Sequence, residues 1–439
     1  MKRVRGWAAA VLLLGPAAAC TVAPAVFVSP LPASRVKAPP PPGAFNAEER
    51  FQRGHYLEVQ HYLESLPEGQ LSKSAANLGL YGQVLLARGD FGAAWPVLEK
   101  ARGLETRTIR RGEIEWAICQ GAILWNDFAT AEEYAASAIR DGVGLVVGFL
   151  HFLTALRDVD VYAGPPVGAE GSDDFEMQGF QLIRIPVRVN GNDSAAIVDS
   201  GAVYTIVTQS FAREVRVRMI PDSRASGRGL HKREFPVDFG VIGELSFGGF
   251  VIRDVPVMVM PDEAMLFETL RGQFPVPIVI GLHLLKEFTL EIDYASRHLH
   301  WTRRDFRTPK RSPDQNLFYR SGRMFVRGSI DRNGFYQFLL DTGSEPTLMT
   351  SVGQFRANLP QSSRVFPKKV YGLGHSQVEW GRISDVTIGV SGWAARFRDL
   401  AVKDDDTAFE DGIIGTSLLE HFHVGIDFSR MVLSLEDGR

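Results

Sequence analysis

Two aspartates lie in matching short motifs 142 residues apart. Each follows an apolar run and precedes a hydroxyl-bearing residue and a glycine, in Asp199-Ser200-Gly201 and Asp341-Thr342-Gly343. Two carboxyl groups that share one site cannot both ionise cheaply, so one proton is shared and one pKa rises. The ionised member can take a proton from water, while the protonated member donates to the carbonyl under attack. The motifs therefore predict hydrolysis by a carboxylate pair, without a metal or a covalent intermediate.

Two further motifs accompany each aspartate in the same order. An apolar segment ending in glycine lies 82 residues after the first aspartate and 74 after the second, and an Ile-Asp-aromatic segment follows 12 residues beyond each glycine. The segments are Pro277–Gly281 with Ile292-Asp293-Tyr294, and Asp411–Gly415 with Ile426-Asp427-Phe428. We infer that one unit occurs twice and that each copy supplies one carboxylate. Asp293 and Asp427 are expected to close each copy structurally rather than to catalyse.

Short strands are expected to hold these motifs in place. From Leu182 onward, runs rich in Val, Ile and Phe alternate with Gly and Asn turns, which is typical of an all-β, barrel-like fold. In each copy a strand, a hairpin turn and a return strand lead directly to the aspartate; the turns are 190–193 and 331–334. Each carboxylate thus stands where a buried strand ends, and the nearby glycine permits a tight backbone.

The ordered double set between Leu182 and Leu435 resembles the retropepsin and pepsin superfamily of aspartic peptidases. The resemblance implies an all-β bilobal fold in which each half supplies one Asp and the neighbouring hydroxyl residue ties the two loops together. It assigns the catalytic pair to Asp199 and Asp341, and the supporting loop positions to Ser200, Gly201, Thr342 and Gly343. Viral members build this site from two identical chains, whereas here a monomer would suffice. No cofactor and no metal are implied.

The same resemblance implies hairpin flaps that close over a bound peptide. Glycine-rich tips suit such a mobile lid. The matching positions are Gly229, Leu230 and His231 in the first half, and Gly372, Leu373 and Gly374 in the second. The alternative is that both segments are ordinary hairpin turns. The histidines His283, His421 and His423 lack metal-ligand spacing and are expected to be structural or on the surface.

Residues 46–163 are predicted to form helical repeats. Gly89-Asp90-Phe91 with Ala94 recurs 37 residues later as Asn126-Asp127-Phe128 with Ala131, and a weaker copy, Gly54-His55-Tyr56 with Val59, lies 35 residues earlier. The period resembles that of tetratricopeptide repeats, although any stack of α-hairpins would fit. Two interpretations remain open: a domain that supports the β part, or a groove for a protein partner or substrate tail.

The N-terminus resembles a bacterial lipoprotein signal. A basic start and an apolar run of about a dozen residues end in Ala17-Ala18-Ala19-Cys20. Cys20 would carry lipid, and Thr21 after it resembles the context of outer-membrane lipoproteins, so we expect an exported protein anchored on the periplasmic side of a bacterial outer membrane. An ordinary signal peptide cleaved after Ala19 is the alternative. The other cysteine, Cys119, is expected to be a small core residue.

The predicted order of segments combines these features. It runs through a signal peptide (1–19), a Pro/Ala-rich tether (20–45), helical repeats (46–163), a linker (164–180), a first β lobe (181–302), a basic linker (303–316) and a second β lobe (317–439). The basic linker, which includes Arg303, Arg304 and Arg307, is expected to be solvated, and contact with anionic lipid or an acidic substrate is the alternative. The formal net charge of −3 in 439 residues argues against binding to nucleic acid.

Two functions from different classes fit the sequence. The first is an exported, membrane-anchored aspartic endopeptidase that acts on peptide or protein substrates through the dyad. The second is a non-catalytic lipoprotein that binds peptides in a pepsin-like cleft or partners through its repeats. The presence of both Asp motifs favours the enzyme.

Overall fold

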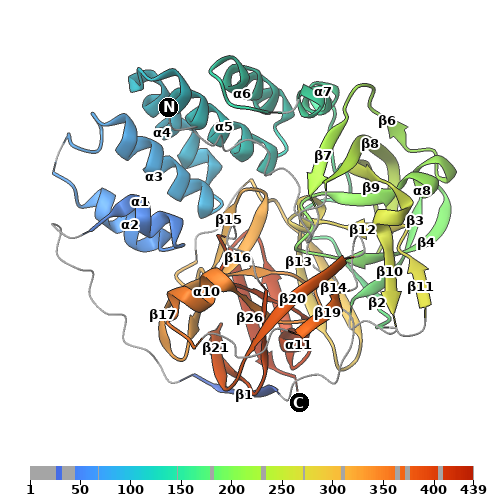
Figure 1. Ribbon diagram of the computed structural model, residues 1–439. Coiled ribbons are helices and arrows are strands. Elements are labelled where there is room, and N and C mark those ends of the chain that lie inside the picture. The colour runs from blue at the N-terminus through green and yellow to red at the C-terminus, as the bar shows by residue number, and fades with distance from the viewer. Residues whose placement is uncertain are drawn as a thin grey trace.

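A helical region is followed by a largely β part in the computed structural model (Figure 1). The structure describes residues 26–31, 45–67, 69–145, 147–177, 182–228, 234–269, 272–307, 312–360, 366–370, 376–403 and 409–438. The predicted signal peptide, Cys20 and all the proposed flap tips lie outside these residues. None of the helices in the described ranges is long and apolar enough to cross a bilayer.

The helical region curves over one side of the sheets as a series of consecutive helices (Figure 1). Its helices are α1 (Ala47–Gln52), α2 (Tyr56–Glu64), α3 (Ala75–Ala87), α4 (Phe91–Leu104), α5 (Thr108–Leu124), α6 (Phe128–Arg140) and α7 (Val147–Leu156). Side chains of Asn46, Ser74, Asp90 and Asp127 accept a hydrogen bond from a backbone N–H in the first turn of α1, α3, α4 and α6 respectively. Such caps satisfy N–H groups that have no partner within the helix.

The repeated motif of the sequence lies at the starts of α2, α4 and α6. Gly54, Gly89 and Asn126 have φ of 80°, 77° and 60°, a left-handed conformation that ends the preceding helix. The aromatic residue two positions later is buried each time, as are the apolar residues that follow it; the aromatics are Tyr56, Phe91 and Phe128. The predicted helices and their turn chemistry are therefore confirmed. Membership of the tetratricopeptide family stays a prediction.

An eight-stranded sheet, counted over the described residues, carries the first Asp motif. Its strands are β3 (Arg184–Val189), β4 (Asn192–Val198), β5 (Thr205–Thr208), β6 (Arg218–Met219), β7 (Ala225–Arg228), β8 (Glu234–Phe247), β9 (Phe250–Met260) and β12 (Ile278–Ile280). The order is β3-β4-β12-β5-β9-β8-β6, with β7 on β8. Helices α8 (Gln209–Glu214) and α9 (Leu282–Leu285), a 3₁₀ turn at Asp262–Met265 and a hairpin of β10 (Leu266–Thr269) and β11 (Gly272–Pro275) complete this part.

An eleven-stranded sheet, again over the described residues, carries the second motif. Its strands are β1 (Val26–Pro30), β15 (Leu317–Arg320), β16 (Arg323–Ile330), β17 (Asn333–Leu340), β18 (Leu348–Thr350), β19 (Phe366–Val370), β20 (Ser376–Ile383), β21 (Val386–Val390), β22 (Trp393–Phe397), β23 (Leu400–Lys403) and β24 (Gly412–Ile414). Helices α10 (Ser351–Arg356) and α11 (Thr416–Leu419) flank them. In the run β17-β24-β18-β23, the first and last neighbouring pairs of strands are parallel and the middle pair is antiparallel. The run β4-β12-β5-β9 of the other sheet has the same pattern.

A third sheet joins strands from distant parts of the chain. It has the order β2-β14-β13-β25-β26, formed by β2 (Glu170–Asp174), β13 (Phe288–Asp293), β14 (His298–Arg303), β25 (Phe422–Asp427) and β26 (Val432–Asp437). β13 and β25 pair antiparallel, with Leu290 opposite Ile426. Both Ile-Asp-aromatic motifs therefore meet in one sheet, which connects the segments that follow the two Asp motifs.

The helical region contacts both Asp-bearing sheets. Phe152 of α7 stacks on Phe239 of β8 with ring centroids 4.4 Å apart, and it also meets Tyr204 edge-on at 5.5 Å. At the other end, the Tyr56 hydroxyl of α2 donates to Gln337 Oε1 of β17 over 3.1 Å. These buried contacts fix the helices against the sheets rather than leaving them on a free linker.

Three segments differ from the sequence prediction. Val26–Pro30, expected to be part of the tether, forms β1 at the edge of the eleven-stranded sheet, antiparallel to β22. Glu170–Asp174, expected to be linker, forms β2 on β14. Arg303, expected to be solvated, ends β14 with a side chain only 12% exposed. In each case the local composition, polar or rich in proline, suggests an irregular segment. Backbone hydrogen bonds to a segment far away in the sequence nevertheless hold it in a sheet.

Candidate active site

The two Asp motifs stand at equivalent strand ends. Asp199 directly follows β4 and its amide donates to Ile280 O of the adjacent β12 over 3.0 Å. Asp341 follows β17 and its amide donates to Ile414 O of β24 over 3.1 Å. Each apolar-apolar-Gly motif thus forms a strand that pairs in parallel with the strand leading to the aspartate. This pairing explains why an Asp motif and an apolar-apolar-Gly motif occur together in each copy.

A reciprocal set of hydrogen bonds joins the two loops. The Ser200 amide donates to Thr342 Oγ1 (3.0 Å), and the Thr342 amide donates to Ser200 Oγ (3.1 Å). The two hydroxyls then donate across to the opposite strands, Ser200 to Leu340 O (2.8 Å) and Thr342 to Val198 O (2.9 Å). Both side chains are fully buried. Ser200 and Thr342 therefore tie the loops as the family resemblance implies.

The glycines after the hydroxyl residues bring the carboxyl groups together. A Cβ on Gly201 would lie 2.5 Å from Asp341 Cγ, and a Cβ on Gly343 would lie 2.2 Å from Asp199 Cγ. Each carboxyl group therefore rests on the glycine of the opposite motif, in space that no other residue type leaves free. The structure brings all six sequence-predicted loop residues, including Ser200 and Thr342, into one site.

Backbone amides orient both carboxylates. Asp199 Oδ1 accepts from the amides of Gly201 (2.8 Å) and Ala202 (3.0 Å), and Asp341 Oδ1 accepts from the Gly343 amide (3.0 Å). Asp341 Oδ2 is buried and accepts no hydrogen bond from any described group. A buried carboxylate oxygen without a donor is costly, so it is the natural position for a shared proton.

Burial and mutual repulsion raise the pKa of the pair. Asp199 is 5% exposed and Asp341 is fully buried. Burial raises the pKa of Asp341 well above its usual range, and the charge of Asp199 raises it further. Burial also raises the pKa of Asp199, although hydrogen bonds from Asp341 and the loop amides oppose that effect. The two groups titrate as one unit that retains a proton to higher pH than ordinary carboxyl groups.

Two threonines support the site but escaped the sequence analysis. Thr205 Oγ1 accepts from the Gly281 amide (3.4 Å), and Thr347 Oγ1 accepts from the Gly415 amide (3.1 Å). Both threonines are buried. Each lies six residues after its aspartate, so the shared offset was a signal that the comparison of the two motifs could have used.

A buried ion pair flanks the second motif and was also not foreseen. Arg356 Nη1 lies 2.7 Å from Asp411 Oδ1, and Asp411 Oδ2 accepts from the Gln337 amide (2.8 Å). Burial raises the pKa of Asp411 to about 6, even though Arg356 acts to lower it. Asp411 thus braces the start of β24, the strand beside Asp341.

The other residues considered in the sequence have structural positions. Asp293 accepts from the amides of Ala295 and Ser296, and Asp427 accepts from the Arg430 amide, so each aspartate stabilises the turn that follows its strand. His283 is buried and stacks on Tyr204 with ring centroids 4.6 Å apart. The Cys119 thiol is fully buried in the helical region, which confirms its expected place in the core.

The flap candidates belong to two hairpins, β7–β8 and β19–β20. The tip residues Gly229, Leu230, His231, Gly372, Leu373 and Gly374 lie outside the described residues. The pairing of the strands on either side of the tips is therefore established, and the role of the tips as flaps stays a prediction. Among the described residues there is no group of three or more His, Cys, Asp or Glu side chains placed to hold a metal ion.

Comparison with known proteins gives a match to one family model and likenesses to many solved structures, among them two aspartic proteases. Residues 185–284 match the family model described as aspartyl protease. The solved structure of a retropepsin-like aspartic protease from Rickettsia conorii is 16% identical, covering 32% of this chain and 95% of its own, with a TM-score of 0.24. The solved structure of an aspartic proteinase from Irpex lacteus is 14% identical in sequence. The match covers 61% of this chain and 97% of that protein, with a TM-score of 0.37. No curated protein matches the chain. The family match, which includes Asp199, supports the aspartic peptidase superfamily for this part of the chain.

Proposed function

We propose that the chain is an aspartic endopeptidase whose dyad is Asp199 and Asp341. The main support is that the two carboxyl groups lie close together, on two loops whose amides donate hydrogen bonds to each other's hydroxyl groups. Paired carboxyls with a shared proton supply both a base and an acid at one point, which is what water-mediated peptide hydrolysis requires. The family match over residues 185–284 supports the same reaction class.

The proposed reaction needs only the dyad, water and the peptide. The ionised carboxyl takes a proton as the water oxygen bonds to the scissile carbonyl carbon, and the protonated carboxyl donates to the carbonyl oxygen. The tetrahedral intermediate then collapses: the C–N bond breaks as the amine nitrogen takes the proton of one carboxyl, and a hydroxyl of the intermediate gives its proton to the other carboxyl as the acid product forms, so the dyad is again singly protonated. The loop hydrogen bonds of Ser200 and Thr342 keep the two carboxyls aligned during both steps.

The wider organisation is part of the same proposal. The two Asp-bearing sheets would form the lobes of one duplicated unit, supported by their matching strand pairings, with the peptide between them and the hairpins β7–β8 and β19–β20 as flaps. The helical region, which packs on both sheets, would recruit the protein to be cut. The sequence around Cys20 supports export and lipid anchoring on the periplasmic side of an outer membrane.

The test is cleavage of a diverse peptide library by purified full-length protein from acid to neutral pH, beside Asp199→Asn and Asp341→Asn. Asp293→Asn is the matched control, because Asp293 also accepts bonds from nearby amides but lies at a turn of the third sheet. Products that vanish in both dyad variants and persist in the control are expected. Unchanged cleavage in the dyad variants would refute the assignment. Peptide binding without cleavage by all proteins would favour the non-catalytic alternative.

A further inference from the structure

A buried ion pair lies beside the second Asp motif. Arg323, at the start of β16, donates two hydrogen bonds to Glu410, from Nη1 to Oε1 and from Nη2 to Oε2, both over 3.3 Å. The side chains of Arg323 and Glu410 are only 5% and 6% exposed. The guanidinium carbon also lies 4.5 Å and 5.4 Å from the ring centroids of Phe409 and Phe325. One carboxylate and two aromatic rings therefore hold a full positive charge in a fixed place inside the fold.

The strand register brings this charge to the level of Asp341. β16 and β17 pair antiparallel, with Phe325 opposite Leu339. Because alternate residues of a strand share one face of the sheet, continuation of this register puts Arg323 opposite Asp341. Burial and the charge of Asp199 raise the pKa of Asp341, and the charge of Arg323 acts to lower it. The ion pair is thus placed to influence how tightly the dyad holds its proton.

The first copy of the unit has apolar residues at both equivalent positions. The register of β3 with β4, continued in the same way, puts Leu182 opposite Asp199. Glu410 is the second residue before β24, and the second residue before the equivalent strand, β12, is Val276. Leu182 and Val276 are buried, with exposures of 4% and 3%. The duplicated fold therefore fills these positions without charge in one copy and with an ion pair in the other.

We propose that Arg323, held by Glu410, is a positioning residue whose charge sets the pH range over which the dyad keeps its single proton. This role rests on the proposed function, in which the dyad catalyses hydrolysis. A buried ion pair adds little net stability over apolar residues of similar size, because desolvation offsets the attraction. The first copy closes without such a pair, so the charge in the second copy serves the neighbouring carboxyl. Loss of the cation should raise the proton affinity of the dyad, and loss of the anion should lower it.

Other charged side chains stand on the elements around Asp341: Asp199 on the facing loop, Glu345 on its own loop, Asp411 before β24 and Arg356 on α10. Asp411 and Arg356 pair with each other, with Nη1 of Arg356 2.7 Å from Oδ1 of Asp411. Burial and, less strongly, Glu410 raise the pKa of Asp411. A substitution of Glu410 therefore also changes the titration of Asp411, and the carboxyl groups of the dyad must be followed separately.

The experiment measures the dyad in two ways, with purified full-length protein. Carbon-13 nuclear magnetic resonance of protein labelled at the aspartate carboxyls follows protonation directly, and the dyad signals are those missing from Asp199→Asn and Asp341→Asn. The pH profile of kcat/KM for peptide cleavage follows the same groups during turnover. Arg323→Gln should move the dyad titration and both limbs of the profile upward by about one pH unit, and Glu410→Gln should move them downward by a similar amount.

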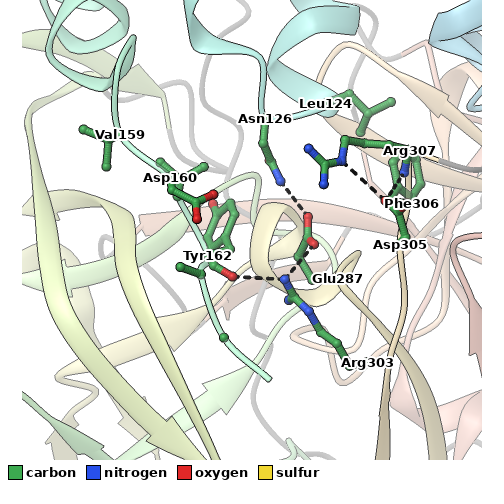
Figure 2. Close-up of a pocket in the computed structure, with 13 residues that line it drawn as sticks. Leu124, Asn126, Val159, Asp160, Tyr162, Glu287, Arg303, Asp305, Phe306 and Arg307 are labelled. Carbon is green, nitrogen blue, oxygen red and sulfur yellow. Dashed lines mark hydrogen bonds and ion pairs between the residues drawn. The ribbon is translucent and has the colours of Figure 1, made fainter. Parts of the chain in front are cut away.

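A double variant and a control separate the effect of charge from loss of structure. Arg323→Leu combined with Glu410→Val copies the apolar pair of the first β lobe and leaves no buried charge unpaired. It should fold as the parent does and shift the titration upward, by less than Arg323→Gln. Arg303→Gln is the control, because Arg303 is also a largely buried arginine 3.3 Å from a glutamate, Glu287, but belongs to the third sheet (Figure 2). Its dyad titration should equal that of the parent.

The opposite signs of the two single variants are decisive. A dyad titration that stays unchanged in both, or moves in the same direction in both, would overturn the proposal and leave the pair with a structural role alone. An equal shift in Arg303→Gln would overturn it as well. Because the resonance titration needs no substrate, opposite shifts in a parent protein that cleaves no peptide would support the charge effect and count against peptide hydrolysis. Cleavage with unshifted titrations would do the reverse.

Discussion

Ser200 and Thr342 exchange hydrogen bonds, each amide donating to the hydroxyl of the other residue over 3.0 Å and 3.1 Å. Because the residues are 142 positions apart, these two bonds fix the relative position of the two Asp-bearing loops. Both hydroxyls also donate to the strand that precedes the opposite aspartate. The geometry of the carboxyl pair is therefore set by hydrogen bonds between buried groups of the two loops and their strands.

Ser200→Ala is expected to lower both stability and turnover. The variant leaves the Thr342 amide and Leu340 O buried without partners, which should cost about 1–3 kcal/mol in the free energy of unfolding. Ser223→Ala is the control, since the Ser223 hydroxyl is buried, donates to Ile220 O and accepts from the Phe239 amide. Denaturant unfolding should show similar losses in both variants, while kcat falls only in Ser200→Ala. An equal fall in kcat for both would show that the loop contact has no special role.

Gly343→Ala is expected to separate the carboxyl groups without unfolding the chain. The new Cβ would lie 2.2 Å from Asp199 Cγ, so the Asp199 side chain must move. A displacement of about 1 Å can cost on the order of 100-fold in rate. Gly103→Ala in α4 is the control, because a Cβ there meets nothing within 4 Å. Comparable peptide turnover in both variants would contradict the proposed role of the glycine.

Asp411 should give stability a distinctive dependence on pH. Its carboxyl keeps a proton to about pH 6 in the folded protein but to only about pH 4 when unfolded. Between these values the folded state binds more protons, so its stability falls as pH rises, by roughly 2–3 kcal/mol for this group. Asp411→Asn should remove that part of the slope when unfolding is measured at several pH values. An unchanged slope between about pH 4 and 6 would show that Asp411 ionises normally.

Asp293 should act with the opposite sign. Hydrogen bonds from Ser296 lower its pKa in the folded protein. Its contribution to stability is therefore present above the unfolded pKa and is lost as pH falls through the lower, folded pKa. Asp293→Asn should flatten the acid limb of the stability profile and leave the slope from about pH 4 to 6 intact. The two variants together separate the two effects in one set of unfolding curves.

Tyr56→Phe should loosen the helical region from β17. The change removes the hydroxyl that donates to Gln337 Oε1, a buried bond worth about 1 kcal/mol net, and more if Gln337 is left unpaired. Amide hydrogen exchange in α2 should become faster. Tyr294→Phe is the control, because the Tyr294 hydroxyl is buried without a partner and its removal should be neutral or slightly stabilising. Unchanged exchange in α2 would show that the tyrosine bond does not hold the helices.

The sequence was sufficient to predict those parts of the structure that have a local sequence signature and that occur more than once in the chain. The Asp motifs, the apolar-apolar-Gly strands and the turn-aromatic repeats each have a local signature that fixes a strand end or a helix start. The threonines Thr205 and Thr347 had such a signature too, in their common offset from the aspartates.

What the sequence did not reveal depends on long-range pairing. Glu287 meets Asn126 from 161 positions away, and nothing around either residue indicates the contact. Arg303 belongs to a basic segment that resembles a solvated linker, yet pairing of β14 with β13 and β2 draws its side chain inward. An edge strand such as β1 is equally hard to predict from the sequence. Its pairing uses backbone N–H and C=O groups, and every residue except proline has both.

The strand β1 changes the reach of the proposed anchor. A flexible tether over residues 21–44 would have let the β part lie several tens of Å from the bilayer and rotate freely. With Val26–Pro30 paired to β22, five residues lie between Cys20 and the fold, so the six residue steps from Cys20 to Val26 span at most about 22 Å. A lipid on Cys20 would then hold the β22 edge close to the headgroups and restrict rotation. The substrates within reach would be those at the membrane surface or tethered to it.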